Sequence, residues 1–339
     1  MGGEAPACVD QQTPSTGALV VGFTTLRTVA PLSQIYRRHR WGSPLASPQM
    51  EKFLSLIAKG PAIGDLSVEQ MRSMLDKTGG QFPAGVHGTP VEAGGVRAEW
   101  VDPEGGADDR AVLYLHGGGY VAGSIDSHRN LIGHLASATG GRVLALDYRL
   151  APEHPATAPV EDSVAAYRWL LDQGFPPAKL AIAGDSAGGG LVMATLLALK
   201  EQGVDQPSSA VGISAWVDME LGGESMATRA DVDPLINPAG IQKMAETFLG
   251  GADPRHPLVS PLLGELSGLP PLLLQVGDHE TLLDDSTRFA AKAEAAGVDT
   301  TLEVWPEMVH VWHGSAGFVP EADQAIARIA EFLAGHVTS

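Results

Sequence analysis

The sequence predicts an α/β fold in which helices cover both faces of a mostly parallel sheet. From about residue 95 onward, short apolar segments alternate with longer segments of helical pattern. Most of the short segments are apolar at nearly every position, which is typical of strands buried on both faces of a parallel sheet. Because strand and helix alternate over about 240 residues, we expect one large sheet with helices on both sides.

The order of the expected elements follows from these patterns. The expected strands are 110–115, 142–146, 179–183, 210–215, 271–276 and 300–304. The expected helices are 127–138, 159–172, 187–202, 285–296 and 321–333. In the last helix, Ala325, Ile326, Ile329 and Phe332 recur at helical spacing, and Gly335 is placed to end it.

The first 94 residues do not share this alternation. Helices are expected near 48–58 and 67–77, and glycines and prolines separate them. The second helix opens with Ser67-Val-Glu-Gln, which resembles a capping box without matching its spacing perfectly. A second irregular segment, 222–250, lies between two expected strands and is also expected to be mainly helical. Both irregular regions are candidates for a lid on the sheet.

The composition excludes several classes of function. The chain has 22 Lys and Arg against 40 Asp and Glu, a net charge of −18, which disfavours binding to nucleic acid or to anionic membranes. Its single cysteine, Cys8, excludes an internal disulfide and a cysteine-based metal site. The start of the chain lacks a basic signal-peptide region, and no apolar run is long enough to span a bilayer. We therefore expect a cytoplasmic protein.

The strongest local signal is Gly184-Asp-Ser186-Ala-Gly188, a G-x-S-x-G pattern. The pattern alone is weak, but an apolar strand precedes it and a helix follows it, which is the context of a nucleophile elbow. Small neighbours allow Ser186 to take a strained backbone conformation with its Oγ exposed. The simpler alternative, an ordinary glycine-rich turn between strand and helix, is disfavoured by this context.

Three consecutive glycines follow another expected strand, in His116-Gly117-Gly118-Gly119. Glycines let the backbone approach a ligand closely and direct N–H groups at it. Acyl transfer needs such donors where the carbonyl oxygen gains negative charge. We expect the N–H groups of Gly117, Gly118 and Ala187 to form this oxyanion hole. A phosphate-binding loop is the competing interpretation, but neither of its glycine patterns occurs in the chain.

A serine nucleophile needs a base, and the base needs an acid that holds its tautomer. Among eleven histidines, His310 follows the last expected strand, from which a loop can reach the edge of the sheet; His313 is a weaker alternative. The acid is expected in the loop that follows strand 271–276. That loop holds four carboxylates among which the residues alone do not choose: Asp278, Glu280, Asp284 and Asp285.

Together these motifs resemble the hormone-sensitive-lipase-like family of α/β-hydrolase esterases, also called bacterial family IV. The resemblance covers residues from about 110 to 335 and includes the segment Asp147-Tyr-Arg-Leu-Ala-Pro-Glu153. It implies an α/β-hydrolase fold, a mostly parallel central sheet flanked by helices, and a helical cap. It also implies an N-terminal cap region at 1–94 and a catalytic domain at 95–339, with a cap insertion at about 222–250. No cofactor and no metal are expected.

The resemblance also implies roles for individual residues. Ser186 matches the nucleophile and His310 the general base. The family's acid usually opens an Asp-Pro-Leu-x-Asp segment, which aligns with Glu280-Thr281-Leu282-Leu283-Asp284. Glu280 therefore takes the acid position in place of the usual aspartate, thirty residues before the histidine as in the family, and Asp284 is the alternative.

Two further sets of residues have expected roles. Arg149 and Glu153 are expected to brace loops beneath the site without taking part in catalysis. Several apolar residues are candidates for the substrate pockets, although core packing is the simpler role for each: Leu54, Ile57, Trp216, Met219, Met244 and Phe248.

The function that follows is a serine carboxylesterase, which hydrolyses short- to medium-chain carboxylic esters through an acyl-enzyme. Its expected partner is a small-molecule ester, with no nucleic acid and no stable membrane anchor, and the resemblance allows a homodimer through the edge of the sheet. A non-catalytic small-molecule receptor on the same fold is one alternative, which the presence of His310 disfavours. An amidase and a lipase are the others.

Overall fold

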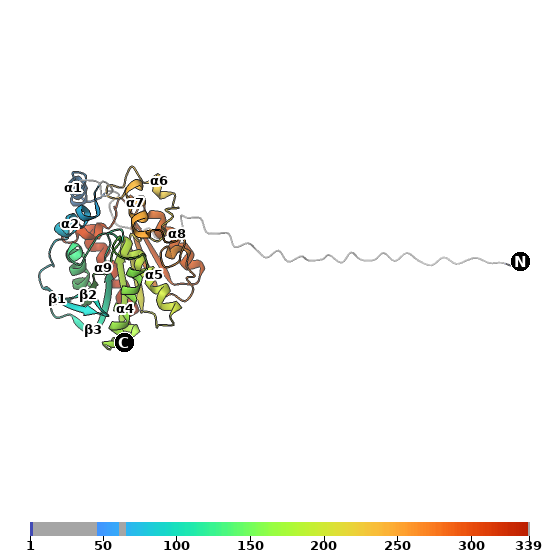
Figure 1. The fold of residues 1–339 in the computed structure, drawn as a ribbon, viewed down its shortest axis with the longest axis horizontal. Coiled ribbons are helices and arrows are strands. Elements are labelled where there is room, and N and C mark those ends of the chain that lie inside the picture. Colours follow the sequence, from blue (N-terminus) through green and yellow to red (C-terminus); the bar gives the residue numbers. More distant parts are fainter. Residues whose placement is uncertain (3–45, 61–65, 338–339) are drawn as a thin grey trace. The chain divides into compact units, whose positions relative to one another are not determined.

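The computed structural model describes residues 1–2, 46–60 and 66–337, so Cys8 lies outside the described residues. The elements below belong to the unit formed by residues 37–339. Their centre is an eight-stranded sheet with the strand order β1-β2-β4-β3-β5-β6-β7-β8 (Figure 1). Strands β3 to β8 pair in parallel with one another, whereas β1 and β2 run antiparallel to their neighbours. The mostly parallel sheet predicted from the sequence is confirmed.

The bounds of the elements follow the sequence-based predictions closely. The strands are β1 Val86–Ala93, β2 Val96–Pro103, β3 Ala107–Leu115, β4 Gly141–Leu146, β5 Leu180–Asp185, β6 Ser209–Ile213, β7 Leu272–Gly277 and β8 Thr300–Trp305. The helices are α1 Pro48–Ile57, α2 Val68–Thr78, α3 Arg129–Thr139, α4 Ala158–Asp172, α5 Ala187–Glu201, α6 Ser225–Thr228, α7 Pro238–Leu249, α8 Leu283–Ala295 and α9 Pro320–His336. Every strand and helix predicted by its range is present, with ends within about three residues.

Strands β1 and β2 are the elements that the sequence analysis missed. β1 is an edge strand whose side chains are mostly exposed, and Gly88 and Pro90 weaken its strand pattern. It pairs with β2 along its whole length, from Val86 to Ala93. The sheet therefore begins at Val86, inside the segment that was expected to be a cap region.

Different helices cover the two faces of the sheet. Successive residues of a strand point to opposite faces, as β3 shows. Its Val112 and Tyr114 are buried in one core together with residues of α3 and α9. Its Leu113 and Leu115 are buried in the other core, together with residues of α4, α5 and α8. The apolar runs in the sequence therefore mark strands that are buried on both faces.

Four helices, α1, α2, α6 and α7, lie at the same end of the sheet, which is the upper end in Figure 1. Helix α2 begins with a complete capping box, since Ser67 Oγ accepts the N–H of Gln70 and Gln70 Oε1 accepts the N–H of Ser67. The expectation of an imperfect match was wrong, because the glutamine stands three residues after the serine, as a capping box requires. Helices α6 and α7 belong to the segment 222–250, called the 222–250 insertion below.

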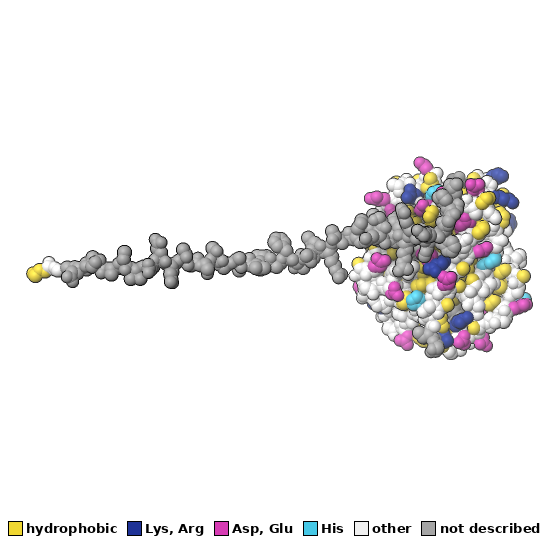
Figure 2. Space-filling view, turned by 180° about the vertical axis from the view of Figure 1, so that it is seen from behind, with side chains coloured by type: hydrophobic (Ala, Val, Ile, Leu, Met, Phe, Trp, Pro, Cys, Tyr) yellow, Lys and Arg dark blue, Asp and Glu magenta, His cyan; other side chains and the backbone are white. Residues whose placement is uncertain are grey.

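The acidic composition is visible on the surface. On the face shown in Figure 2, carboxylates are scattered among fewer lysines and arginines, with no broad basic patch. This distribution accords with the net charge of −18. Within residues 46–60 and 66–337, no helix combines the length and the hydropathy needed to cross a bilayer.

Candidate active site

Ser186 lies at the turn where strand β5 becomes helix α5. Its φ of 54° is unusual for a residue with a side chain. The turn is tight enough that a Cβ added to Gly188 would overlap the carbonyl oxygen of Leu115. A small residue is therefore required there, and the strained serine with its small neighbours has the backbone geometry typical of a nucleophile elbow.

Three side chains from separate loops meet at this turn. His310 Nε2 lies 2.9 Å from Ser186 Oγ, and His310 Nδ1 lies 3.0 Å from Glu280 Oε2. Glu280 follows β7 and His310 follows β8, so both residues come from loops at the C-terminal ends of parallel strands. All three are buried. A hydroxyl, an imidazole and a carboxylate thus form one chain of hydrogen bonds.

The carboxylates of the loop after β7 have different partners. Glu280 Oε1 accepts hydrogen bonds from Ser214 Oγ at 2.8 Å and from the N–H of Gly277 at 2.6 Å, which leaves Oε2 for the histidine. Asp284 Oδ2 instead accepts the N–H of Ser225 in the 222–250 insertion at 2.8 Å. This contact gives Asp284 a structural role.

The other two carboxylates of that loop also bind backbone groups. Asp285 Oδ1 accepts the N–H groups of Val217 and Asp218 at 2.9 and 3.1 Å. Asp278 Oδ1 accepts the N–H of Glu307 at 2.6 Å. Within the part of the chain that the structure describes, Glu280 is therefore the carboxylate of this loop that hydrogen-bonds His310.

The electrostatics of the three residues suit proton transfer. Burial raises the pKa of Glu280 above its usual value, and its hydrogen bonds offset this only in part. Burial alone would lower the pKa of His310, but the hydrogen bond and charge of Glu280, together with the charges of Asp233 and Asp185, raise that pKa overall. These interactions stabilise the imidazolium, the form that His310 takes after it accepts a proton.

The glycine loop that follows β3 supplies backbone donors beside the elbow. The N–H of Gly117 donates to Asp185 Oδ1 at 3.1 Å and is therefore already engaged. The N–H groups of Gly118 and Gly119 donate to no acceptor among the described residues. Ala187 is the first residue of α5, where N–H groups have no partner inside the helix. Backbone donors without an acceptor among the described residues are thus present in the glycine loop and at the start of α5.

Comparison with known proteins gives consistent matches. A family model described as alpha/beta hydrolase fold matches residues 112–314. An acetyl-hydrolase from Streptomyces hygroscopicus is 46% identical over 85% of this chain and 97% of that protein. The crystal structure of an esterase from the bacterial hormone-sensitive lipase family has a TM-score of 0.84 and 47% identity, covering 87% of this chain and 100% of that chain.

The chain belongs to this family of esterases. An esterase from Acinetobacter venetianus, 36% identical over 83% of this chain and 94% of that protein, agrees with the assignment. The protein is therefore a carboxylic ester hydrolase with an α/β-hydrolase fold, as the sequence predicts.

In the esterase, Asp185 links the glycine loop to the elbow. It is fully buried between Tyr114, whose hydroxyl donates to Oδ1 at 2.7 Å, and His128, whose Nε2 lies 3.2 Å from Oδ2. Burial would raise the pKa of Asp185, but the charge and hydrogen bond of His128 lower it overall. Asp185 directly precedes Ser186 in the chain. Its anionic carboxylate therefore anchors Gly117 to the elbow. The sequence signal for this link was the aspartate inside the elbow motif, which the sequence analysis left without a role.

The 147–153 segment braces the same loop. Tyr148 Oη donates to the carbonyl oxygen of His116 at 2.6 Å, and the two rings stack at 4.3 Å. The N–H of Ala151 donates to the carbonyl oxygen of Tyr120 at 3.0 Å. These bonds hold the glycine loop at both of its ends, so the segment has a structural role.

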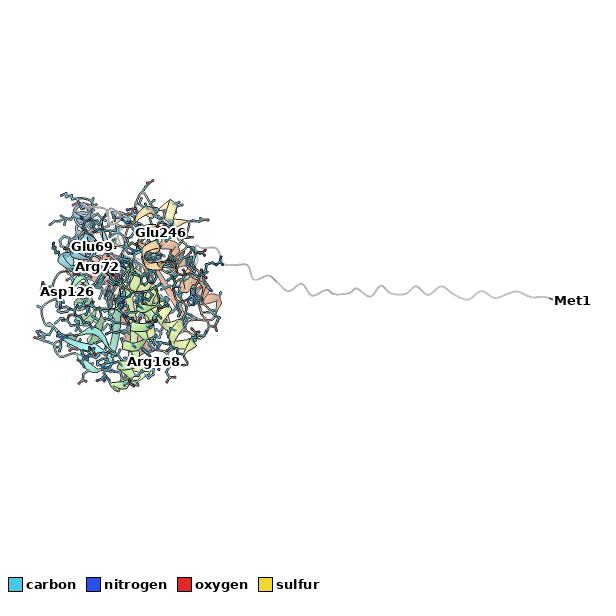
Figure 3. All side chains as sticks on the ribbon, in the orientation of Figure 1. Met1, Glu69, Arg72, Asp126, Arg168 and Glu246 are labelled. Atoms are coloured by element: carbon cyan, nitrogen blue, oxygen red, sulfur yellow. The ribbon has the colours of Figure 1, made fainter. Side chains whose placement is uncertain are left out.

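Arg149 and Glu153 also have structural partners. Arg149 Nε donates to Asp162 of α4 at 2.9 Å. Glu153 pairs with Arg72 of α2 at 2.8 Å, and Arg72 Nε donates to the carbonyl oxygen of Val121 at 2.8 Å. Arg72, labelled in Figure 3, thereby connects helix α2 to the glycine loop.

Most of the remaining candidates are buried in the core. His313 Nε2 lies 2.8 Å from Gln275 Oε1, and burial lowers its pKa to about 3, so it is a neutral core residue. Four of the apolar pocket candidates are buried in the core on the α5 face: Trp216, Met219, Met244 and Phe248. Leu54 and Ile57 of α1 are half-buried. Across the described residues, no group of three or more His, Cys, Asp or Glu could hold a metal ion.

Proposed function

We propose that the esterase uses Ser186 as nucleophile, His310 as general base and Glu280 as the acid that orients the histidine. The supporting observation is the continuous chain of hydrogen bonds from Ser186 Oγ through both nitrogens of His310 to Glu280 Oε2, at 2.9 and 3.0 Å. Nε2 of His310 accepts the hydroxyl proton as Oγ attacks the ester carbonyl, and Glu280 stabilises the resulting imidazolium. The imidazolium then gives its proton to the leaving alcohol, and a water activated by the same imidazole hydrolyses the acyl-enzyme.

For the oxyanion we propose the N–H groups of Gly118, Gly119 and Ala187. Gly117 was expected among the donors, but its N–H already donates to Asp185. We therefore assign Gly117 to holding the loop and Gly119 to the donor set. Backbone donors fixed before the reaction stabilise the negative charge of the tetrahedral intermediate without reorganising.

We propose that α1, α2 and the 222–250 insertion form a cap and that the acyl groups are short to medium in length. Bulky side chains next to the glycine loop support this limit. Tyr120 stacks on Phe248 with ring centroids 4.0 Å apart, and a Cβ added to Gly119 would overlap Met244. The name acetyl-hydrolase, carried by the Streptomyces hygroscopicus relative, points to a small acyl group in that protein.

The decisive variant is Ser186→Ala. It should lower kcat with p-nitrophenyl acetate by about 10⁴-fold or more, because the nucleophile and base act as a unit. It should also abolish covalent labelling by an organophosphate. Ser55→Ala is the matched control, since Ser55 is exposed and its Oγ donates to the carbonyl oxygen of Lys52. Retention of most of the activity by Ser186→Ala would falsify the assignment.

The same preparation distinguishes the alternative functions. A non-catalytic receptor would bind esters without turnover and would not react with the organophosphate. A lipase would prefer long-chain esters across a series of p-nitrophenyl esters, and an amidase would turn over the matching anilides. A homodimer and a cytoplasmic location stay predictions.

A further inference from the structure

Asp233 of the 222–250 insertion has contacts on two sides. It lies between α6 and α7, 9% exposed, and its Oδ1 accepts the N–H groups of Leu235 and Ile236 at 3.0 and 2.9 Å, which closes its own turn. Its Oδ2 accepts both the N–H of Thr281, at 2.8 Å, and the Thr281 hydroxyl, at 3.1 Å. One carboxylate thus ties the insertion to the loop after β7, 48 residues further along the chain.

Thr281 is fully buried, and each of its polar groups binds the insertion. Its N–H and hydroxyl donate to Asp233, and its carbonyl oxygen accepts the hydroxyl of Ser225 at 2.6 Å. Thr281 directly follows Glu280, whose Oε2 has to stay within hydrogen-bond distance of His310 Nδ1. The position of the Thr281 backbone therefore determines where the Glu280 side chain starts.

The resemblance given above aligns the family's Asp-Pro-Leu-x-Asp segment with Glu280-Thr281-Leu282-Leu283-Asp284, which implies that threonine stands at the position of proline. Proline has no N–H and no hydroxyl and could donate neither bond to Asp233. Glutamate has one more rotatable bond than aspartate, so it loses more conformational freedom when it is held in place. The longer acid and the anchored loop therefore occur together.

We propose that Asp233 is a positioning residue that holds Glu280 against His310 by binding Thr281. In this arrangement the 222–250 insertion completes the triad as well as covering the substrate. The inference rests on the proposed triad. Asp233 touches no reacting atom, and it acts through the Thr281 backbone and through its own charge.

The charge of Asp233 provides a readout that a purely structural contact would not affect. The titratable groups facing His310 are Glu280, Asp233, Asp185 and His313. Burial lowers the pKa of His310, and the three carboxylates raise it. His310 has to be neutral to accept the serine proton, so kcat/KM falls as the pH drops below its pKa. Removing the charge at position 233 lowers that pKa and moves the acid limb of the pH profile to lower pH.

Three variants separate these effects. Asp233→Asn keeps an Oδ1 acceptor for its own turn but places an amide NH₂ where Thr281 needs an acceptor. Thr281→Val keeps the shape and the N–H bond, and removes the hydroxyl bond alone. Asp253→Asn is the matched control, because exposed Asp253 accepts the N–H of Arg255 at 2.9 Å in the same kind of turn.

The measurements are kcat, KM and the pH profile of kcat/KM with p-nitrophenyl acetate, together with Tm. Asp233→Asn should lower kcat about tenfold, with KM changed less than about twofold, since two hydrogen bonds to a carboxylate are lost. It should also move the acid limb to lower pH. Thr281→Val should lower kcat by a smaller factor and leave the acid limb in place. Asp253→Asn should change neither kcat nor the acid limb.

Several results would overturn the proposal. The proposal fails if Asp233→Asn has the kcat and the pH profile of the wild type, whether or not its Tm is lower. It also fails if Asp253→Asn lowers kcat and moves the acid limb as much as Asp233→Asn does. If Asp233→Asn does not fold, an unchanged kcat in Thr281→Val overturns it. If Glu280→Gln retains full activity, the triad fails instead, which distinguishes the two inferences.

Discussion

Carboxylates in the loop after β7 differ in function because each oxygen has a different partner. Glu280 reaches the imidazole of His310, whereas Asp284 binds a backbone N–H of the 222–250 insertion. A carboxylate can orient a catalytic histidine only when it lies within hydrogen-bond distance of Nδ1. The geometry therefore favours Glu280 as the acid.

A pair of amide substitutions tests this assignment. Glu280→Gln keeps the shape of the side chain but removes the negative charge facing His310, so kcat should fall by about 10³- to 10⁴-fold with little change in KM. In Asp284→Asn the amide can rotate so that its oxygen accepts the Ser225 N–H and its NH₂ faces the Thr287 hydroxyl, so kcat should change by less than about tenfold. Steady-state kinetics with p-nitrophenyl acetate gives kcat for both variants. A larger loss of kcat in Asp284→Asn than in Glu280→Gln would make Asp284 the acid.

The sequence predicted which residues lie together in the site better than it predicted the hydrogen bonds that hold each of them in place. Ser186 and His310 follow from chain order and strand ends, because the loops at the C-terminal ends of parallel strands share one edge of the sheet. Whether the N–H of Gly117 is free depends on where the Asp185 side chain points, which no spacing reveals. The bond between Asp233 and Thr281 joins residues 48 apart through a turn without a recognisable pattern.

At the scale of elements, helix α2 is part of the support of the glycine loop. Arg72 on this helix donates to the carbonyl oxygens of Val121 and Ala151 at 2.8 and 3.0 Å and pairs with Glu153. Val121 lies three residues after Gly118, a proposed oxyanion donor. The N-terminal helix therefore contributes to the position of the backbone donors.

Substitutions at the two ends of this ion pair should have unequal effects. Arg72→Gln removes the charged bonds to both carbonyls and should lower the free energy of unfolding by about 1–3 kcal/mol and kcat several-fold. Glu153→Gln leaves those bonds intact, and its side chain is 54% exposed, so less than about 0.5 kcal/mol should be lost. Urea denaturation and kcat measure both. If the two variants lose the same free energy of unfolding and the same kcat, the contribution of Arg72 comes from its ion pair with Glu153 and not from its bonds to the carbonyl oxygens.

The strands at the centre of the sheet were predictable because they are apolar. β4 to β7 and the second half of β3 are mostly apolar because helices cover both of their faces, and their ranges followed from that pattern. Burial alone was not sufficient, since β2 is mostly buried and was missed. β1 escaped prediction because most of its side chains face solvent and Gly88 and Pro90 interrupt it. At the edge of a sheet, pairing with β2 forms the strand despite its weak pattern.

At the scale of the whole molecule, the excess of carboxylates is tolerated because most lie at the surface, and the buried ones are hydrogen-bonded. Asp285 is a partial exception, because it is fully buried and only one of its oxygens is hydrogen-bonded. Oδ1 accepts two backbone N–H groups, whereas Oδ2 has no partner among the described residues. Burial, reinforced by the charge of Asp218, raises its pKa from 3.8 to about 7. Below about pH 7 the folded protein therefore holds a proton on Asp285 that the unfolded chain releases near pH 4.

This proton makes the stability of the whole fold depend on pH. Since the folded state binds more protons than the unfolded state between about pH 4 and 7, this residue's contribution to stability is present at low pH and is lost as pH rises. At about 1.4 kcal/mol for each tenfold difference in proton affinity, the loss is on the order of 4 kcal/mol. Asp285→Asn keeps the Oδ1 acceptor and cannot ionise, so its Tm relative to wild type should rise between pH 5 and pH 8.5. Exposed Asp253→Asn should show no such trend in calorimetry, and a constant difference for Asp285→Asn would mean that Asp285 is ionised throughout.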